Sequence, residues 1–213
     1  QRQMCIRDRL INSSIDIAMG GGQKFFDLSE INDTHHLLIT KDSLEQNFDH
    51  SKKLIGLFDD DGIVRSDEHP TQRQMTNFAL NHLNEQCNGF ILMTEGSQID
   101  WAGHANNVEY MLVEFADFDA TVQAAADFAA ASQNTLVLVT ADQSTGGFVL
   151  QRPRGSKVPA QWTTGSHDLS PINIYAYGPG AELFSGVMDN TEIFDRILLA
   201  LDYKNLESAN CIN

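Results

Sequence analysis

The sequence is poor in cysteine, in basic side chains and in long apolar runs. Its 213 residues include three cysteines (Cys5, Cys87 and Cys211), an odd number without a framework spacing, which predicts free thiols rather than a set of disulfides. No stretch reaches the ~18 consecutive apolar residues that a membrane-spanning helix needs. Lysine and arginine number 14 against 29 aspartates and glutamates, which gives a net charge of −15. This charge disfavours nucleic acids and anionic lipids as partners, because its field repels phosphate groups.

The composition is otherwise that of a globular protein, with 42% apolar and 20% charged residues. A small phosphate-bearing substrate is compatible with the acidic surface when bound metal cations reverse the field locally. Residues 1–14 mix polar and charged side chains and lack the apolar core of a signal peptide. We leave this segment unassigned and interpret it as a non-native junction, and we expect residues 15–213 to be the C-terminal part of a single domain.

Alternating strand and helix patterns predict the fold class. Short apolar runs between turn residues predict strands at Ile15–Met19, Leu37–Thr40, Leu54–Phe58, Phe90–Thr94, Thr135–Thr140 and Ile172–Tyr177. Apolar stripes at helical spacing predict helices at Thr71–Cys87 and Val108–Ala131, and a last helix after the capping-box segment Asp189–Glu192. The continuous apolar character of Phe90–Thr94 indicates a strand buried on both faces. The order of elements indicates a layered α/β/α fold with a largely parallel central sheet.

Acids and histidines gather where the predicted strands end. Glu95 follows one predicted strand and Asp142 follows another, and ligands of such folds collect outside the carboxyl ends of the strands. Asp100 and His104 stand four residues apart, so one helical turn would place them on the same side. His167 lies in a glycine-flanked turn before a third strand. Carboxylate with imidazole suits zinc, whereas Glu95, an oxygen donor, suits magnesium.

Each of these residues also has a simpler interpretation. An isolated aspartate–histidine pair is commonly a surface ion pair, and an isolated glutamate at a strand end is commonly solvated. The convergence of several nitrogen and oxygen donors within ten residues, with another acid after a second strand, favours the metal site. The remaining histidines lie in polar or loop settings, and we expect them at the surface: His35, His36, His50, His69 and His82.

Several segments resemble the alkaline phosphatase family. They are DIAMGGGQKFF (Asp16–Phe26), EGSQIDWAGHANN (Glu95–Asn107), NTLVLVTADQSTGGF (Asn134–Phe148), WTTGSH (Trp162–His167) and IYAYGPGAELFSG (Ile174–Gly186). The resemblance implies a fold with two zinc ions and one magnesium ion at the carboxyl end of a large sheet. By position, Asp100, His104 and His167 would bind one zinc, Asp142 the second zinc, and Glu95 the magnesium. It further implies hydrolysis of phosphate monoesters through a phosphoserine, a homodimer, and export to the periplasm or the extracellular space.

Two departures from the family pattern stand out. Gln143 occupies the position of a histidine that follows the Asp142 position in the family, and an amide oxygen is a weaker zinc donor than imidazole. The resemblance also begins in the middle of the family's sequence, and no segment matches its nucleophile motif. We therefore assign no nucleophile; Ser97, Ser144 and Ser166 lie near the expected metals but do not match. The alternatives to a phosphatase are a catalytically silent zinc-binding fragment and an inactive, acidic binding homologue.

Overall fold

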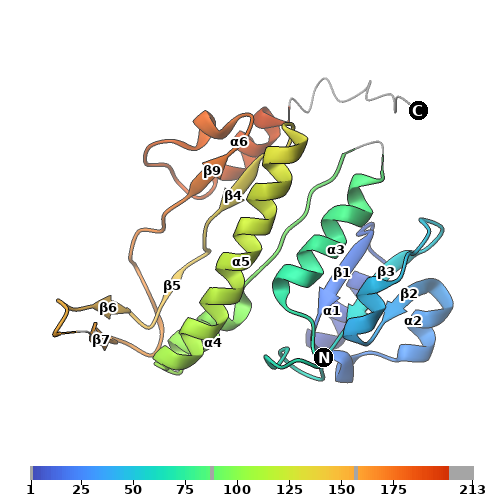
Figure 1. The fold of residues 1–213 in the computed structure, drawn as a ribbon, viewed down its shortest axis with the longest axis horizontal. Helices are drawn as coiled ribbons and strands as arrows, with labels where there is room; N and C mark the ends of the chain where they lie inside the picture. The colour runs from blue at the N-terminus through green and yellow to red at the C-terminus, as the bar shows by residue number, and fades with distance from the viewer. Residues whose placement is uncertain (1, 87–88, 156–157, 202–213) are drawn as a thin grey trace. The chain divides into compact units, whose positions relative to one another are not determined.

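The computed structural model describes residues 2–86, 89–155 and 158–201, and the chain divides into two compact units, Gln1–Ala79 and Leu80–Asn213 (Figure 1). The domain boundary expected at residue 15 stays a prediction. The predicted free thiols also stay a prediction, because Cys87 and Cys211 lie outside the described residues.

The first unit is built on a three-stranded parallel sheet. Strand β3 (Lys53–Leu57) lies between β1 (Ile17–Gly20) and β2 (His35–Leu38), with Ile17 opposite Leu54 and Leu37 opposite Ile55. The accompanying helices are α1 (Arg2–Ile11), η1 (Gln23–Phe25), α2 (Leu28–Thr34), η2 (Lys41–Glu45) and α3 (Gln72–Asn84), the last of which continues into the second unit.

Both faces of this sheet are buried, because successive side chains of β3 point to opposite sides. Leu54 and Phe58 belong to one apolar cluster, against which Met75 and Phe78 of α3 pack. On the other face, Ile55 and Leu57 pack with Ile31 of α2, and Ile11 of α1 covers them. The parallel, layered α/β/α arrangement expected from the sequence is therefore confirmed in this unit.

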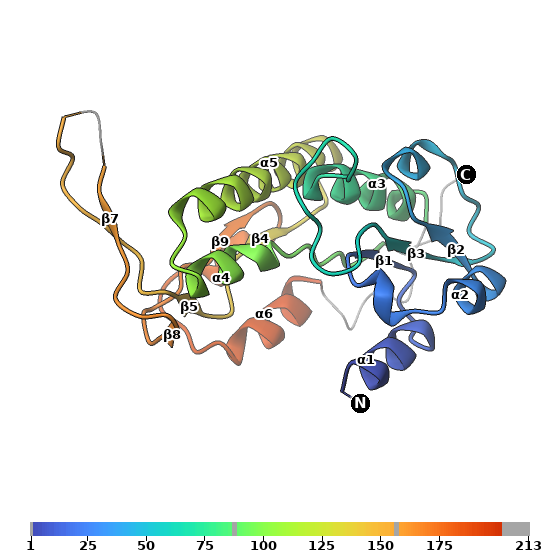
Figure 2. The same cartoon turned by 90° about the horizontal axis from the view of Figure 1, so that it is seen from below.

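The second unit combines helices with short antiparallel strand pairs. Figure 1 shows the long helix α5 (Val108–Ser132) running alongside β4 (Val137–Val139), and β4 pairs with β9 (Tyr175–Tyr177). The other pairs are β5 (Ser144–Thr145) with β8 (His167–Asp168), and β6 (Val149–Leu150) with β7 (Ala160–Gln161). The remaining helices are α4 (Ser97–His104), η3 (Ala181–Phe184) and α6 (Glu192–Ala200). Within this unit, the β6–β7 hairpin extends away from the helices (Figure 2).

The junction between α4 and α5 follows from the segment His104–Asn107. Asn106 adopts a left-handed backbone conformation (φ 51°), its N–H donates to the Gly103 carbonyl, and the next N–H donates to the Ala102 carbonyl. This is a Schellman motif, which ends α4 at His104. The side chain of Asn107 then accepts from the Tyr110 N–H and begins α5. Two asparagines thus place His104 in the last turn of a short helix.

Most predicted elements are confirmed, but Phe90–Thr94 is not a strand. The residues numbered 89–96 carry neither helix nor strand, and no strand among the described residues pairs with them. Ile91 and Met93 are 79% and 84% exposed, so the expected burial on both faces is also wrong. An apolar run forms a strand only when a partner backbone lies beside it, which the local pattern does not reveal. The sheet pairs of the second unit are antiparallel, in contrast to the parallel sheet of the first.

Two histidines expected at the surface are buried instead. His35 is 6% exposed at the start of β2, and His82 is 9% exposed in α3. Desolvation of the His35 ring, with the positive charges of Lys53 and Lys52, lowers its pKa. Its Nδ1 atom forms a hydrogen bond of 2.8 Å with the Thr34 hydroxyl, which makes burial of the ring tolerable. Among the other three, His36 and His69 are partly buried and His50 is exposed.

No helix within the described ranges combines the length and apolar character needed to cross a membrane.

Candidate metal centre

Helix α4 supplies two of the three side chains of the candidate site. Asp100 and His104 are one turn apart, and His104 Nε2 lies 3.5 Å from Asp100 Oδ2. The sequence predicted this pairing from the spacing alone, and the structure confirms that the two groups share one side of a helix.

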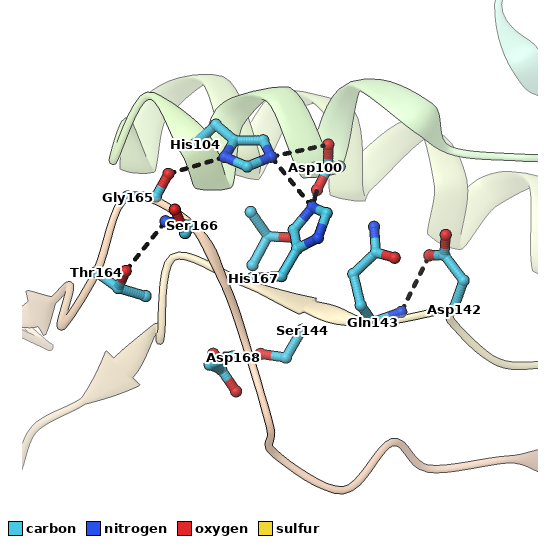
Figure 3. Close-up of polar contacts among 11 residues, drawn as sticks. Asp100, His104, Asp142, Gln143, Ser144, Thr164, Gly165, Ser166, His167 and Asp168 are labelled. Atoms are coloured by element: carbon cyan, nitrogen blue, oxygen red, sulfur yellow. Dashed lines mark hydrogen bonds and ion pairs between the residues drawn. The ribbon is translucent and has the colours of Figure 1, made fainter.

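His167, the first residue of β8, brings the third side chain. Its Nε2 atom lies 3.4 Å from Asp100 Oδ1 and 3.2 Å from His104 Nε2. Potential ligand atoms of the three residues all lie within 4.8 Å of one another, and Figure 3 shows both rings and the carboxylate converging on one point. The fold thus brings Asp100, His104 and His167 together, although 63 positions separate the two histidines. Their assignment as metal ligands stays a prediction.

The donor atoms of these three residues lie close enough together to hold one metal ion. Zinc binds nitrogen and oxygen at about 2.0–2.1 Å, so two ligands of a tetrahedral site lie about 3.3 Å apart, whereas an octahedral site would bring neighbours to about 3.0 Å. The two nitrogen atoms lie 3.2 Å apart, close to the tetrahedral value. Asp100 approaches them with different oxygens, Oδ2 at 3.5 Å from His104 and Oδ1 at 3.4 Å from His167, and one atom from each residue gives a group within 4.8 Å. Two imidazoles and one carboxylate are also a donor set that zinc accepts.

The ring of His104 is oriented by a backbone carbonyl. His104 Nδ1 lies 2.8 Å from the Gly165 oxygen, and because a carbonyl only accepts, Nδ1 carries the proton and donates it. With the proton on Nδ1, the lone pair of a neutral imidazole lies on Nε2, the atom that faces Asp100 and His167. Such an outer hydrogen bond fixes the tautomer of metal-binding histidines.

Asp100 is held by the neighbouring strand. The Thr145 hydroxyl of β5 donates to Asp100 Oδ1 at 2.5 Å. Helix α4 can approach β5 this closely because residue 103 is glycine: a Cβ atom there would lie 3.0 Å from the Thr145 side chain. Gly103 and Thr145 together therefore set the distance between the helix and the strand that carry the candidate ligands.

We predict that Thr145→Val weakens metal binding about tenfold, because outer hydrogen bonds to ligands contribute about 10–100-fold in affinity. Valine keeps the shape of threonine and removes only the hydroxyl that orients Asp100. The measurement is zinc titration of the chain against a chromogenic chelator. Thr163→Val is the matched control, because the Thr163 hydroxyl donates to the Gly147 carbonyl at 3.2 Å and does not contact the three donors.

The candidate site is open to solvent. The side chains of Asp100, His104 and His167 are 33%, 42% and 50% exposed. Structural zinc sites are closed by four protein ligands, whereas catalytic sites use three and keep a position for water or substrate. Three converging protein donors at an exposed surface are typical of the second kind.

The other predicted ligands lie outside this group. Glu95 is exposed in the segment before α4, and Asp142 is exposed two residues before β5, where its carboxylate accepts the Gln143 N–H at 3.1 Å. Figure 3 shows the Gln143 side chain on the same side of the strand as His167. The assignments of Glu95 and Asp142 as ligands stay predictions.

Asp168, which follows His167, lies on a different side of the strand. Hydrogen bonds from the side chain and the N–H of Ser170, and then from the Ser144 hydroxyl, hold the pKa of Asp168 below its usual value. Figure 3 shows Ser144 and Asp168 on the side of β5 that faces away from α4. Asp168 is therefore an ionised group beside the candidate ligands that does not point at them.

A comparison with known protein families identifies the family to which the chain belongs. The family model for alkaline phosphatase matches residues 1–161. The chain belongs to the alkaline phosphatase family. The match includes α4 with Asp100 and His104, and it ends before His167, which the structure adds to the group.

Curated alkaline phosphatases align with almost the whole chain. Alkaline phosphatase 3 of Bacillus subtilis is 29% identical over 92% of this chain and 60% of its own length. Alkaline phosphatase of Escherichia coli is 28% identical over 93% of this chain and 55% of its own length. The chain thus spans somewhat more than half the length of these alkaline phosphatases.

Solved alkaline phosphatases share the fold. The enzyme from the Antarctic bacterium TAB5 is 31% identical, with a TM-score of 0.80 over 94% of this chain and 64% of its own. A variant of that enzyme with Mg bound gives a TM-score of 0.79. The cold-active enzyme of Shewanella sp. is 21% identical and shows the same fold with a TM-score of 0.85. The α/β fold expected from the resemblance is confirmed as an incomplete alkaline phosphatase fold.

Sequence reasoning missed the residues that support the candidate ligands of this chain. Thr145 follows Asp142 by three positions, and a polar residue there gave no sign that it would reach back to Asp100. The Gly165 carbonyl has no signal at all in the sequence, because every residue carries one. The β5–β8 pairing that brings these groups together is long-range and could be found only from the folded chain.

Proposed function

We propose that this chain supplies the metal-binding part of a hydrolase that acts on phosphate monoesters. The observation that carries the proposal is the convergence of Asp100, His104 and His167, whose potential ligand atoms lie within 4.8 Å of one another. Because the chain spans about 60% of the length of Bacillus subtilis alkaline phosphatase 3, we assign the activity to the whole protein rather than to these residues alone.

We assign the cofactors by residue. Asp100, His104 and His167 would hold one zinc ion. Asp142 would hold a second zinc ion and Glu95 a magnesium ion, a pair supported by family membership and by their donor types. Gln143 offers a neutral amide beside Asp142, so we expect the second zinc site to be weaker than the first.

The chemistry of such a site is electrostatic. Bound metal ions supply the positive charge that phosphoryl transfer needs on the oxygens where negative charge develops. The residues of this chain hold that charge in place: Gly165 fixes the His104 ring, and Thr145 fixes the Asp100 carboxylate. The exposure of His104 and His167 leaves room for a phosphate group to reach the site.

The partners and the location follow from the same assignment. We infer small phosphate monoesters as substrates, a homodimer, and export to the periplasm or the extracellular space, all supported by membership of the alkaline phosphatase family. The net charge of −15 argues against nucleic acid as a substrate that binds over a large surface.

A metal-depletion experiment on the longer protein that contains this chain tests the proposal. We expect hydrolysis of p-nitrophenyl phosphate, loss of hydrolysis after removal of metals by a chelator, and recovery when zinc and magnesium are returned. In parallel, the 213-residue chain is expected to bind at least one zinc ion, measured by elemental analysis after desalting. Hydrolysis that survives complete metal removal, or a chain that retains no zinc, would contradict the proposal.

A further inference from the structure

The strand that carries His167 is held by an unusually short ladder. Strands β5 and β8 form only two residue pairs, Ser144 with Asp168 and Thr145 with His167. Strands in globular proteins are commonly about 5–6 residues long, and a short ladder is marginal without further contacts. The position of β8 therefore depends on what its side chains contact.

The two residue pairs of this ladder face opposite sides, as the alternation of side chains along strands requires. Thr145 and His167 face α4, where both contact Asp100. Ser144 and Asp168 face away from α4 (Figure 3). The second pair therefore lies behind the candidate ligands, on the same two strands.

Asp168 connects three segments on this rear face. Its Oδ2 atom accepts the Ser144 hydroxyl at 2.9 Å, and its Oδ1 atom accepts the Ser170 N–H at 2.8 Å. The Gly147 N–H also donates to its carboxylate. One side chain thus joins β5, the turn after β5 and the segment after β8.

His167 needs such support because its side chain is 50% exposed. A half-exposed ring is not fixed by packing, so the position of its backbone decides where Nε2 lies. That atom must stay about 3.3 Å from the donors on α4 to share a tetrahedral ion with them.

We propose that Asp168 is a positioning residue, which with Ser144 fixes strand β8 and thereby holds His167 against Asp100 and His104. The inference rests on the proposed zinc site, and it assigns Asp168 no contact with the metal or the substrate. A competing explanation is that the carboxylate raises zinc affinity only through its negative charge. The two explanations predict different zinc affinities for Asp168→Asn, because asparagine keeps the shape and one carbonyl oxygen of the side chain but removes its charge.

The test is zinc affinity of the 213-residue chain, measured by competition with a chromogenic chelator. Asp168→Ala is expected to weaken zinc binding about tenfold, the lower end of the range for outer contacts of metal ligands. Asp168→Asn is expected to stay within about threefold of the wild type, and Ser144→Ala to fall between the two. Cobalt(II) provides a second readout: at saturating cobalt, the visible absorption of Asp168→Ala should change because His167 is displaced.

Asp49→Ala is the matched control. Asp49 accepts the Ser51 N–H at 2.8 Å, the same turn at the same distance as Asp168 with Ser170, but in the first unit. It removes the same charge and should leave the zinc affinity and the cobalt spectrum unchanged. Far-UV circular dichroism confirms that each variant is folded.

The outcomes distinguish failure of the proposed zinc site from failure of the positioning role of Asp168. A wild-type chain that binds no zinc overturns the proposed site and the inference together. Wild-type binding with an Asp168→Ala affinity within twofold overturns the positioning role alone. Equal losses of zinc affinity in Asp168→Ala and Asp168→Asn assign the effect to the negative charge of Asp168. This outcome also overturns the positioning role.

Discussion

His104→Ala is expected to weaken zinc binding by roughly 100-fold or more. Zinc bound by three or four protein ligands releases on the order of 10–16 kcal/mol, so one ligand accounts for about 3 kcal/mol, or about two orders of magnitude. His104 lies within 3.5 Å of Asp100 and 3.2 Å of His167, so its loss leaves only two donors. The zinc content of the purified chain, measured by elemental analysis, should fall accordingly.

His36→Ala is the control for this substitution. His36 Nε2 lies 3.4 Å from Asp49 Oδ1, nearly the same histidine–carboxylate distance as in the candidate site. Among the described residues, the group of converging metal donors consists of Asp100, His104 and His167, and His36 and Asp49 are not part of it. Removing His36 should therefore leave the zinc content unchanged. A zinc content that His104→Ala does not reduce would show that this histidine is not a ligand.

Gly146→Ala is expected to lower the free energy of unfolding by about 2–5 kcal/mol. Gly146 has φ +83°, where a Cβ atom costs about 1–2 kcal/mol. That Cβ would also lie 2.5 Å from the Trp162 ring and 2.8 Å from the Gly103 oxygen, and such overpacking costs about 1–3 kcal/mol more. Urea denaturation followed by tryptophan fluorescence measures the change, because Trp101 and Trp162 both belong to the second unit.

Gly186→Ala separates the two contributions. Gly186 has a similar backbone angle, φ +89°, but no atom lies within 4 Å of a Cβ built there. Its substitution should cost only the backbone part, about 1–2 kcal/mol. If Gly146→Ala and Gly186→Ala lower the free energy of unfolding by the same amount, the overlap of the added Cβ with the Trp162 ring does not contribute to the loss.

Local chemistry made part of this site predictable. The i, i+4 spacing of Asp100 and His104 depends only on helix geometry, so the sequence was sufficient to pair them. The asparagines that follow, which end α4 and begin α5, act through their immediate neighbours. The length of α5 followed from its apolar stripe for the same reason.

Long-range pairing was not predictable in the same way. The apolar run Phe90–Thr94 reads as a buried strand, yet Ile91 and Met93 are exposed, because burial depends on which segments lie beside it. His35 was expected at the surface for the same reason: the covering of β2 cannot be inferred from its own residues. The opposed faces of Ser144 and Thr145 became meaningful only once β8 was known to be their partner.

The separation of 63 residues between His104 and His167 has a consequence for how the protein folds. Bringing the ends of so long a loop together costs on the order of 3–4 kcal/mol of chain entropy, and little is recovered until the last contacts form. Asp100 and His104 can therefore take their positions early, because both lie on α4. His167 joins them only after the intervening residues have folded. A metal ion bound by all three residues would stabilise the fold of the residues between them. The free energy of unfolding would therefore depend on the concentration of the metal ion.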